Sequence, residues 1–365
     1  MRDPRQKKLA GILVDYSTRV RAGDIVFLRY GEGTPPEFVR EIQARCLERG
    51  ARYVRLDFVD SDLSRDYLRL ASPAALKYFP RFELEFMKEV DVFIGVGAPL
   101  NSRVFAGIPG KVLAARSRLL RPIQDERVSR TRWVVTRYPT QGQAQEAGMS
   151  FSDFEEFYFR ACNIDWARIR VKQAALARLL GRARHCRISA PDTDLSFSLE
   201  GMPAVSCHGE RNMPDGEVFT APVVGTVEGH IRFNTICDCA GQRVTNPRFE
   251  FRKGRVVKAE AEGGQSELDA VLATDSGARV PGEFSFGLNR RLTRPLGSTL
   301  FDEKIAGSIH LALGSAYEDC DNGNRSAIHW DMVRLMRDGE VYLDGKLVQR
   351  RGRFLPEKLR ALNRN

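Results

Sequence analysis

The chain has 365 residues, of which 42% are hydrophobic and 28% are charged. This balance excludes an intrinsically disordered chain, and the length favours two domains. The formal net charge is +10, but basic and acidic residues are interspersed, which argues against a nucleic-acid partner.

The N-terminal segment and the cysteines predict a cytoplasmic protein. Residues 1–8 are charged and no long apolar segment follows, so we expect no secretory signal. No stretch approaches the roughly 20 apolar residues of a membrane span, so no membrane partner is expected. The seven cysteines lack the spacing of a disulfide framework. Cys237 and Cys239 are expected to be small core residues.

In the first half of the chain, segments with strand character alternate with segments of helical periodicity. Strands are expected at residues 24–30, 53–58, 90–96 and 132–136, and helices at 35–49, 152–162 and 167–180. This alternation predicts a parallel or mixed sheet covered by helices. Gly95-Val96-Gly97 does not predict a dinucleotide loop, because Leu100 takes the place of the third glycine.

The pattern changes after about residue 184. Strands are expected at 186–190 and 195–199, a helix near 266–273, and hairpins at 248–261 and 340–349. Asp344-Gly345 is the strongest turn signal among them. The predicted fold is therefore an α/β N-terminal domain (1–184) plus an α+β C-terminal metal-binding domain (185–365) with a largely antiparallel sheet.

His329 and Asp331 stand two residues apart in an apolar segment. On a strand both side chains project from one face, and Trp330 projects from the other. A buried carboxylate needs a partner to offset desolvation. The partner of Asp331 could be His329 itself, in a hydrogen-bonded His–Asp pair in the core, or a metal ion that both residues bind. The other candidate ligands in this half of the chain favour the metal.

Further imidazole and carboxylate groups occur where a ligand fits. His310 lies inside an apolar stretch, and Glu217 and Glu283 each follow a turn signal and precede hydrophobic residues. An exposed strand-edge charge is the simpler explanation for one such acid, but several in one domain weaken it. Glu303 fits either a ligand or a charged loop. Two imidazoles with three or more carboxylates are enough for two divalent ions, so metal-assisted hydrolysis is favoured.

Tyr317 follows His310 in a loop rich in polar residues. Its phenol is a candidate donor to an oxyanion, and a surface tyrosine is the alternative. The remaining histidines, at 185, 208 and 230, do not lie in comparable sequence settings and are not candidate ligands.

The segments that carry these candidates resemble the M29 family of metallopeptidases, the thermophilic aminopeptidase T group. The resemblance runs through residues 50–54, 138–141, 212–222, 282–283, 301–314 and 327–331. It spans nearly the whole chain, and the ordered C-terminal motifs are specific in combination.

The resemblance implies an aminopeptidase that uses two divalent ions (zinc, cobalt or manganese) to remove N-terminal residues from peptides. It assigns metal ligation to six residues: Glu217, Glu283, Glu303, His310, His329 and Asp331. Glu283 and Tyr317 are the implied catalytic residues. A homodimer with an enclosed active-site cavity is also implied.

Two other functions stay open from the residues alone. A mononuclear iron ring-cleaving dioxygenase would use His310, His329 and Asp331 as a facial triad. That function gives no reason for Glu217 and Glu283. A non-catalytic binding protein would show degenerate ligands, and none is obvious.

Overall fold

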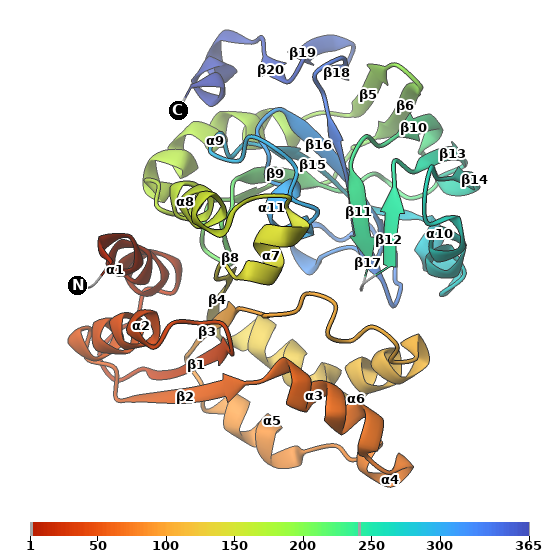
Figure 1. Cartoon of the computed structure of the whole chain (residues 1–365). Helices are drawn as coiled ribbons and strands as arrows, with labels where there is room; N and C mark the ends of the chain where they lie inside the picture. The colour runs from red at the N-terminus through yellow and green to blue at the C-terminus, as the bar shows by residue number, and fades with distance from the viewer. Residues whose placement is uncertain (1–2, 240–241, 365) are drawn as a thin grey trace. The chain divides into compact units, whose positions relative to one another are not determined.

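The computed structural model describes residues 3–239 and 242–364 (Figure 1). The chain forms two compact units, of which unit 1 comprises residues 1–164 and 209–213, and unit 2 comprises residues 165–208 and 214–365. The division into functional domains at residue 184 stays a prediction. Among the described residues, no helix has the length and apolar character that crossing a membrane requires.

Unit 1 contains a five-stranded parallel sheet in the order β2-β1-β3-β4-β8. Its strands are β1 (Ile25–Gly31), β2 (Tyr53–Val59), β3 (Val92–Gly97), β4 (Arg132–Arg137) and β8 (Asn212–Met213). The first four lie within a residue or two of the predicted positions. β8 is a short strand that no periodic pattern marks.

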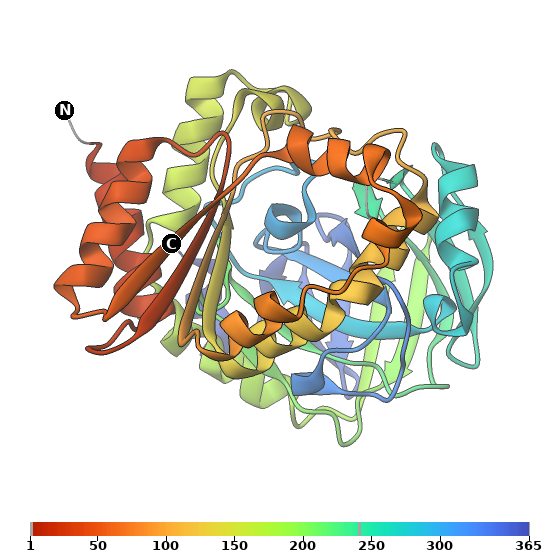
Figure 2. The ribbon, with the colours of Figure 1, turned by 90° about the horizontal axis from the view of Figure 1, so that it is seen from below.

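Helices cover both faces of this sheet. Figure 2 shows α1 and α2 on one side of the strands and α5 and α6 on the other. The helices of unit 1 are α1 (Pro4–Gly11), the π-helix η1 (Ile12–Ser17), α2 (Pro36–Glu48), α3 (Ser61–Leu70), α4 (Pro73–Leu76), α5 (Arg81–Lys88), α6 (Gly110–Arg130), α7 (Gln141–Glu146) and α8 (Phe151–Cys162). Helices α2 and α8 were expected from the sequence, whereas helices α3 to α7 were not.

Unit 2 contains two large antiparallel sheets. The eight-stranded sheet has the order β14-β13-β10-β6-β5-β18-β19-β20. Its strands are β5 (His185–Ala190), β6 (Thr193–Ser198), β10 (Glu228–Arg232), β13 (Arg248–Arg252), β14 (Arg255–Glu260), β18 (Glu340–Leu343), β19 (Lys346–Arg350) and β20 (Arg353–Phe354). Both predicted hairpins, β13-β14 and β18-β19, are present.

The second sheet has the order β17-β16-β15-β9-β7. Its strands are β7 (Val205–Cys207), β9 (Glu217–Thr220), β15 (Pro281–Gly287), β16 (Ser308–Gly314) and β17 (His329–Leu335). The other elements of unit 2 are α9 (Trp166–Leu180), β11 (Ile236–Cys239), β12 (Gln242–Thr245), α10 (Gln265–Leu272), η2 (Ser276–Arg279), α11 (Thr299–Asp302), η3 (Glu318–Cys320) and η4 (Glu357–Asn363). Parallel and antiparallel sheets in these places confirm the predicted fold class.

The main hydrophobic core of unit 2 lies between its two large sheets. Phe197 of β6 packs edge-on against Phe284 of β15, with ring centroids 5.1 Å apart. Phe249 of β13 packs against Trp330 of β17 at 6.3 Å. Cys237 belongs to this core, as the sequence analysis expected. One face of the β17-β16-β15-β9-β7 sheet thus packs in the hydrophobic core, and its other face is available to polar side chains.

Candidate metal centre

Five of the six candidate ligands lie on the face of the β17-β16-β15-β9-β7 sheet that points away from this core. Successive side chains of a strand point to opposite faces, so apolar and polar residues segregate. The core face carries Val218, Phe284, Phe286, Ile309, Leu311, Trp330 and Met332. The opposite face carries Glu217, Glu283, Ser285, His310, His329 and Asp331. Strands β17, β16, β15 and β9 therefore place both predicted imidazoles and three of the predicted carboxylates on one face of the sheet.

Two glycines let neighbouring loops approach this sheet closely. Gly216 has a φ of +115° in the turn before Glu217, and a Cβ there would lie 3.1 Å from the Cβ of Asn289. At Gly287 a Cβ would lie 2.9 Å from the carbonyl oxygen of Glu303. A larger residue at 287 would push the segment that carries Glu303 away from the sheet.

The imidazole and carboxylate atoms lie within ion-pair distance of one another. His310 Nε2 lies 2.9 Å from Glu283 Oε1 and 3.4 Å from Glu217 Oε2. The same nitrogen lies 3.7 Å from Asp331 Oδ1. His329 Nε2 lies 3.6 Å from Glu283 Oε2 and 3.4 Å from Asp331 Oδ1. Glu283 therefore faces both imidazoles, one through each of its oxygens.

These residues form overlapping groups of potential metal ligands. In each group the ligand atoms all lie within 4.8 Å of one another: Glu217, Glu283 and His310; Glu283, His329 and Asp331; Glu303, His310 and Asp331. Glu283 belongs to two of the groups, and so does His310. Such sharing is the arrangement that a pair of neighbouring ions requires.

Backbone carbonyl groups orient both imidazoles. His310 Nδ1 lies 3.3 Å from the carbonyl oxygen of Glu303, and His329 Nδ1 lies 2.7 Å from that of Ser315. A carbonyl oxygen only accepts, so each Nδ1 carries a proton and donates it. The Nε2 atom of each ring then faces the carboxylates, where it serves as a metal ligand once deprotonated.

His310, His329 and Glu303 hold their protons more tightly than usual, because they are buried among carboxylates. Burial disfavours the imidazolium ion of His310, but the hydrogen bond with Glu283 and the nearby carboxylate charges outweigh it and raise its pKa to about 9. Burial disfavours the imidazolium ion of His329, but its interactions with Asp331, Glu283 and the Ser315 carbonyl together outweigh burial and raise its pKa to about 10. Burial raises the pKa of Glu303 to about 8. Metal ions and protons therefore compete for the same atoms.

Several buried atoms of the cluster have no hydrogen-bond partner among the described residues. They are Glu283 Oε2, His329 Nε2 and Asp331 Oδ1. An unsatisfied buried polar atom costs about 1–3 kcal/mol, and more when it is charged. The three residues that carry these atoms form one of the ligand groups. Nitrogen and carboxylate donors aimed at a common point fit a divalent ion of the zinc, cobalt or manganese type.

The structure also contains a cation that the sequence analysis missed. Lys304 is 1% exposed, and its Nζ lies 2.5 Å from Glu217 Oε1 and 2.7 Å from Glu303 Oε1. Burial disfavours the ammonium ion, but the charges of these two carboxylates outweigh it and raise the pKa of Lys304 well above its usual range. Glu303 is therefore a buried, paired carboxylate and not part of a solvated loop.

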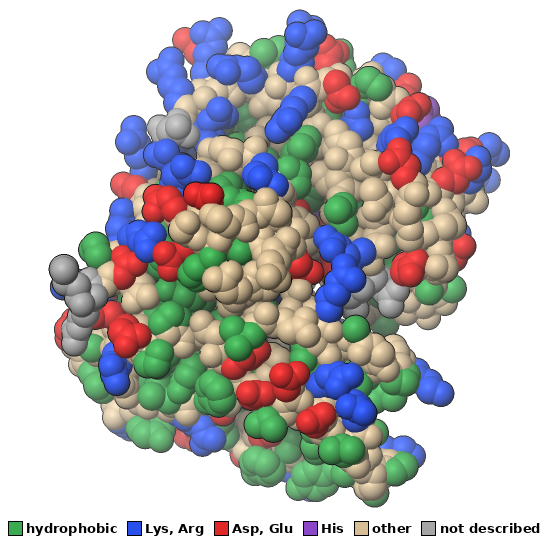
Figure 3. All heavy atoms as spheres, viewed as in Figure 1, with side chains coloured by type: hydrophobic (Ala, Val, Ile, Leu, Met, Phe, Trp, Pro, Cys, Tyr) green, Lys and Arg blue, Asp and Glu red, His purple; other side chains and the backbone are tan. Residues whose placement is uncertain are grey.

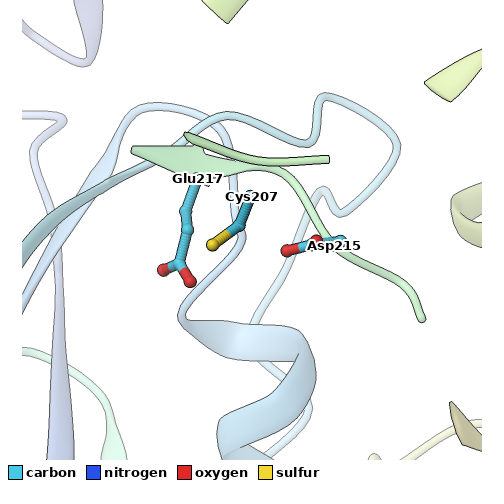
Figure 4. Close-up of side chains that lie close together, drawn as sticks. All are labelled: Cys207, Asp215 and Glu217. Atoms are coloured by element: carbon cyan, nitrogen blue, oxygen red, sulfur yellow. The ribbon is translucent and has the colours of Figure 1, made fainter. Parts of the chain in front are cut away.

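A further group of donors lies beside Lys304. Cys207, Asp215 and Glu217 have ligand atoms within 4.8 Å of one another, and Figure 4 shows their side chains close together. Neither Cys207 nor Asp215 was a candidate, because a thiol on a short strand and an acid in a turn carry no distinctive spacing. Burial raises the pKa of the Cys207 thiol well above its usual value.

Tyr317 lies next to the cluster and outside it. Its ring centroid is 4.5 Å from that of His329 and 6.0 Å from that of Phe219, and the residue is 51% exposed. The phenol therefore borders the candidate ligands and remains reachable from solvent.

Comparison with known proteins identifies the family of the chain. Residues 2–353 match the family described as thermophilic metalloprotease (M29). Aminopeptidase T of Thermus aquaticus is 28% identical, over 87% of this chain and 91% of the relative. Aminopeptidase 2 of Geobacillus stearothermophilus is 26% identical, over 93% of each chain.

Two solved structures share the fold over almost the whole chain. Wild-type AmpT from Thermus thermophilus superposes with a TM-score of 0.86 at 25% identity, covering 97% of this chain and 99% of its own. A 2,5-dihydroxypyridine dioxygenase from Pseudomonas putida KT2440 superposes with a TM-score of 0.63 at 15% identity, covering 97% and 98%. At that identity the second likeness shows the fold alone.

Fold and family match together define a metallopeptidase. The chain belongs to the thermophilic metalloprotease family M29. The aminopeptidase relatives and this membership confirm the predicted enzyme class, a metallo-aminopeptidase.

Proposed function

We propose that this chain hydrolyses the first peptide bond of peptides with a free N-terminus, using two divalent ions. The observation that carries the proposal is the position of Glu283, which faces His310 through one oxygen and His329 through the other. The ligands in this proposal are Glu217, Glu283, Glu303, His310, His329 and Asp331.

Bound ions would polarise the scissile carbonyl and lower the pKa of a water molecule toward neutrality. The chain's own groups supply the remaining chemistry. The carboxylate of Glu283 accepts the proton of the attacking water. The phenol of Tyr317 donates a hydrogen bond to the developing oxyanion. The surrounding carboxylates attract the free α-amine of the peptide, which favours removal of terminal residues.

The dioxygenase alternative is less well supported. A facial triad of His310, His329 and Asp331 leaves no role for Glu217 and Glu283, although both are buried in contact with His310. The family match points to peptide hydrolysis.

Metal identity, oligomeric state and compartment rest on the family resemblance and the composition. We propose zinc, cobalt or manganese as the native metal, since these carboxylate and imidazole donors suit all three. We also propose a homodimer, which light scattering after size-exclusion chromatography tests directly. Cytoplasmic localisation stays a prediction.

The proposed function is tested by metal analysis coupled to a substrate panel. Protein dialysed against a chelator should lose hydrolysis of aminoacyl-4-nitroanilides, and zinc, cobalt or manganese should restore it. Elemental analysis should find two ions per chain. A matched substrate with an acetylated N-terminus should not react. One iron per chain without peptidase activity would favour the dioxygenase.

A further inference from the structure

Lys304 is a buried cation inside a cluster of carboxylates, and the proposed chemistry leaves it without a role. Its side chain is 2% exposed and is ion-paired with Glu217 and Glu303. Removing an ammonium ion from water costs several kcal/mol even after relaxation, unless close partners compensate it. A lysine in such a place therefore calls for an explanation in terms of the site.

The donor group Cys207, Asp215 and Glu217 lies beside this ammonium (Figure 4). Besides its contact with Glu217, Lys304 Nζ lies 4.0 Å from Asp215 Oδ1. A thiolate and two carboxylates would suit zinc or cadmium. In this protein, the cation next to those donors is the ammonium group of Lys304.

We propose that Lys304 is a positioning residue that takes the cation position of the Cys207, Asp215 and Glu217 group and confines divalent ions to the other three groups, each of which contains Glu283 or His310. The inference rests on the proposed function. Because the ammonium holds Oε1 of both Glu217 and Glu303, the other oxygen of each is left for metal. Glu217 Oε2 accordingly faces His310 Nε2 and accepts a hydrogen bond from Ser285 Oγ at 3.1 Å.

The charges of the cluster agree with this role. Five carboxylates lie in these groups: Asp215, Glu217, Glu283, Glu303 and Asp331. Fully ionised, they carry five negative charges. Two divalent ions supply four positive charges and Lys304 supplies the fifth. A third divalent ion in place of Lys304 would need a sixth negative charge, which the buried Cys207 thiol can supply only by losing its proton.

The experiment is a cadmium titration of wild-type protein and Lys304→Ala, followed by ultraviolet absorption and elemental analysis. Wild-type protein should bind cadmium without a thiolate-to-cadmium absorption band. Lys304→Ala should bind one further ion per chain and show the band, with the thiol proton released to the buffer. The double variant Lys304→Ala/Cys207→Ser should lose both the band and the additional ion.

The inference is overturned if folded Lys304→Ala, checked by circular dichroism, binds no further ion and shows no band. It is also overturned if wild-type protein shows a band that Cys207→Ser removes, and this arm decides the question even if Lys304→Ala fails to fold. The number of ions per wild-type chain tests the proposed function separately. A wrong metal count and a wrong role for Lys304 are therefore distinguishable.

Discussion

Glu283 is the residue on which the proposed chemistry depends most. Its side chain contacts both imidazoles, and its Oε2 is a buried oxygen without a hydrogen-bond partner among the described residues. Glu283→Gln keeps the size of the side chain but removes its charge and its capacity to accept a proton. Since a general base contributes about 10²–10⁴-fold, kcat on leucine-4-nitroanilide should fall by at least that range.

The matched control for this variant is Glu250→Gln, the same chemical change on β13 (Arg248–Arg252) of the other sheet. It should keep wild-type turnover. Because Glu283 is also a proposed ligand, the metal content of each variant has to be measured alongside kcat. Wild-type turnover by Glu283→Gln at full metal content would contradict the assignment of the base.

Tyr317 tests the proposed stabilisation of the oxyanion. Tyr317→Phe retains the ring that packs against His329 and Phe219 and removes only the hydroxyl. Loss of one oxyanion donor typically lowers turnover by about 10²–10³-fold, so kcat should fall by that amount while KM changes little. Tyr342→Phe, on β18 of the other sheet, is the control. An unchanged kcat would make Tyr317 an ordinary surface residue.

At the residue scale, the sequence predicted the histidines better than the charges around them. A histidine in an apolar strand is unusual enough to mark His310 and His329. Lys304 gave no such signal, because a lysine within Asp302-Glu303-Lys304 is indistinguishable from one on a solvated loop. Its burial arises from the close approach of that segment to Gly287, which is a tertiary contact and not a local pattern.

At the scale of elements, strand alternation carries most of the information. The spacing of His329 and Asp331 placed both on one face of a strand, and the structure has them on β17 with Trp330 on the opposite face. The order of strands β17-β16-β15-β9 was not predictable, because periodicity says which side chains share a face but not which strands are neighbours. Helices α3 to α7 were missed for a related reason. Leu63 and Leu70 of α3 are exposed, so their spacing does not report a core.

The segment that leads into β17 is anchored by Asp275. Its carboxylate accepts hydrogen bonds from the Ala327 backbone N–H and the Ser326 hydroxyl, both at 2.7 Å, and from two backbone N–H groups of η2. Burial raises the pKa of Asp275, but these hydrogen bonds outweigh it and leave the pKa below its usual value. The ionised carboxylate therefore helps to fix the start of the strand that carries His329.

The pH dependence of this anchor has a definite sign. A lowered folded-state pKa contributes stability above the unfolded value of about 4, and this stability is lost as the pH falls through the folded value. Asp275→Asn should lower the free energy of unfolding by about 1 kcal/mol at pH 7. Urea denaturation at pH 7 and pH 3 should show a smaller difference between variant and wild type at pH 3. An equal difference at both values would mean that the charge of Asp275 does not contribute.

At the scale of the whole molecule, every candidate ligand belongs to unit 2. Unit 1 supplies a parallel sheet with helices on both faces and none of the six proposed ligands. The face shown in Figure 3 carries both basic and acidic side chains. Metal binding should therefore act first on the stability of unit 2.

Tryptophan fluorescence during thermal unfolding tests this expectation. The chain has three tryptophans, of which Trp133 lies in unit 1 and Trp166 and Trp330 lie in unit 2. In Trp133→Phe the remaining fluorescence reports unit 2. Metal at 100 times its Kd stabilises the native state by about 2.7 kcal/mol per site, which corresponds to roughly 5–10 °C in the unfolding midpoint of a unit of this size.

Adding His329→Ala to Trp133→Phe should remove most of that shift, because it deletes a proposed ligand whose Nε2 has no hydrogen-bond partner among the described residues. Adding His230→Ala instead should preserve the shift, since His230 lies on β10 of the eight-stranded sheet. The comparison separates a specific site from general adhesion of metal to histidine. If both double variants respond to metal as Trp133→Phe does, the ions bind elsewhere. The buried imidazoles and carboxylates of the β17-β16-β15-β9-β7 sheet then do not form the metal centre.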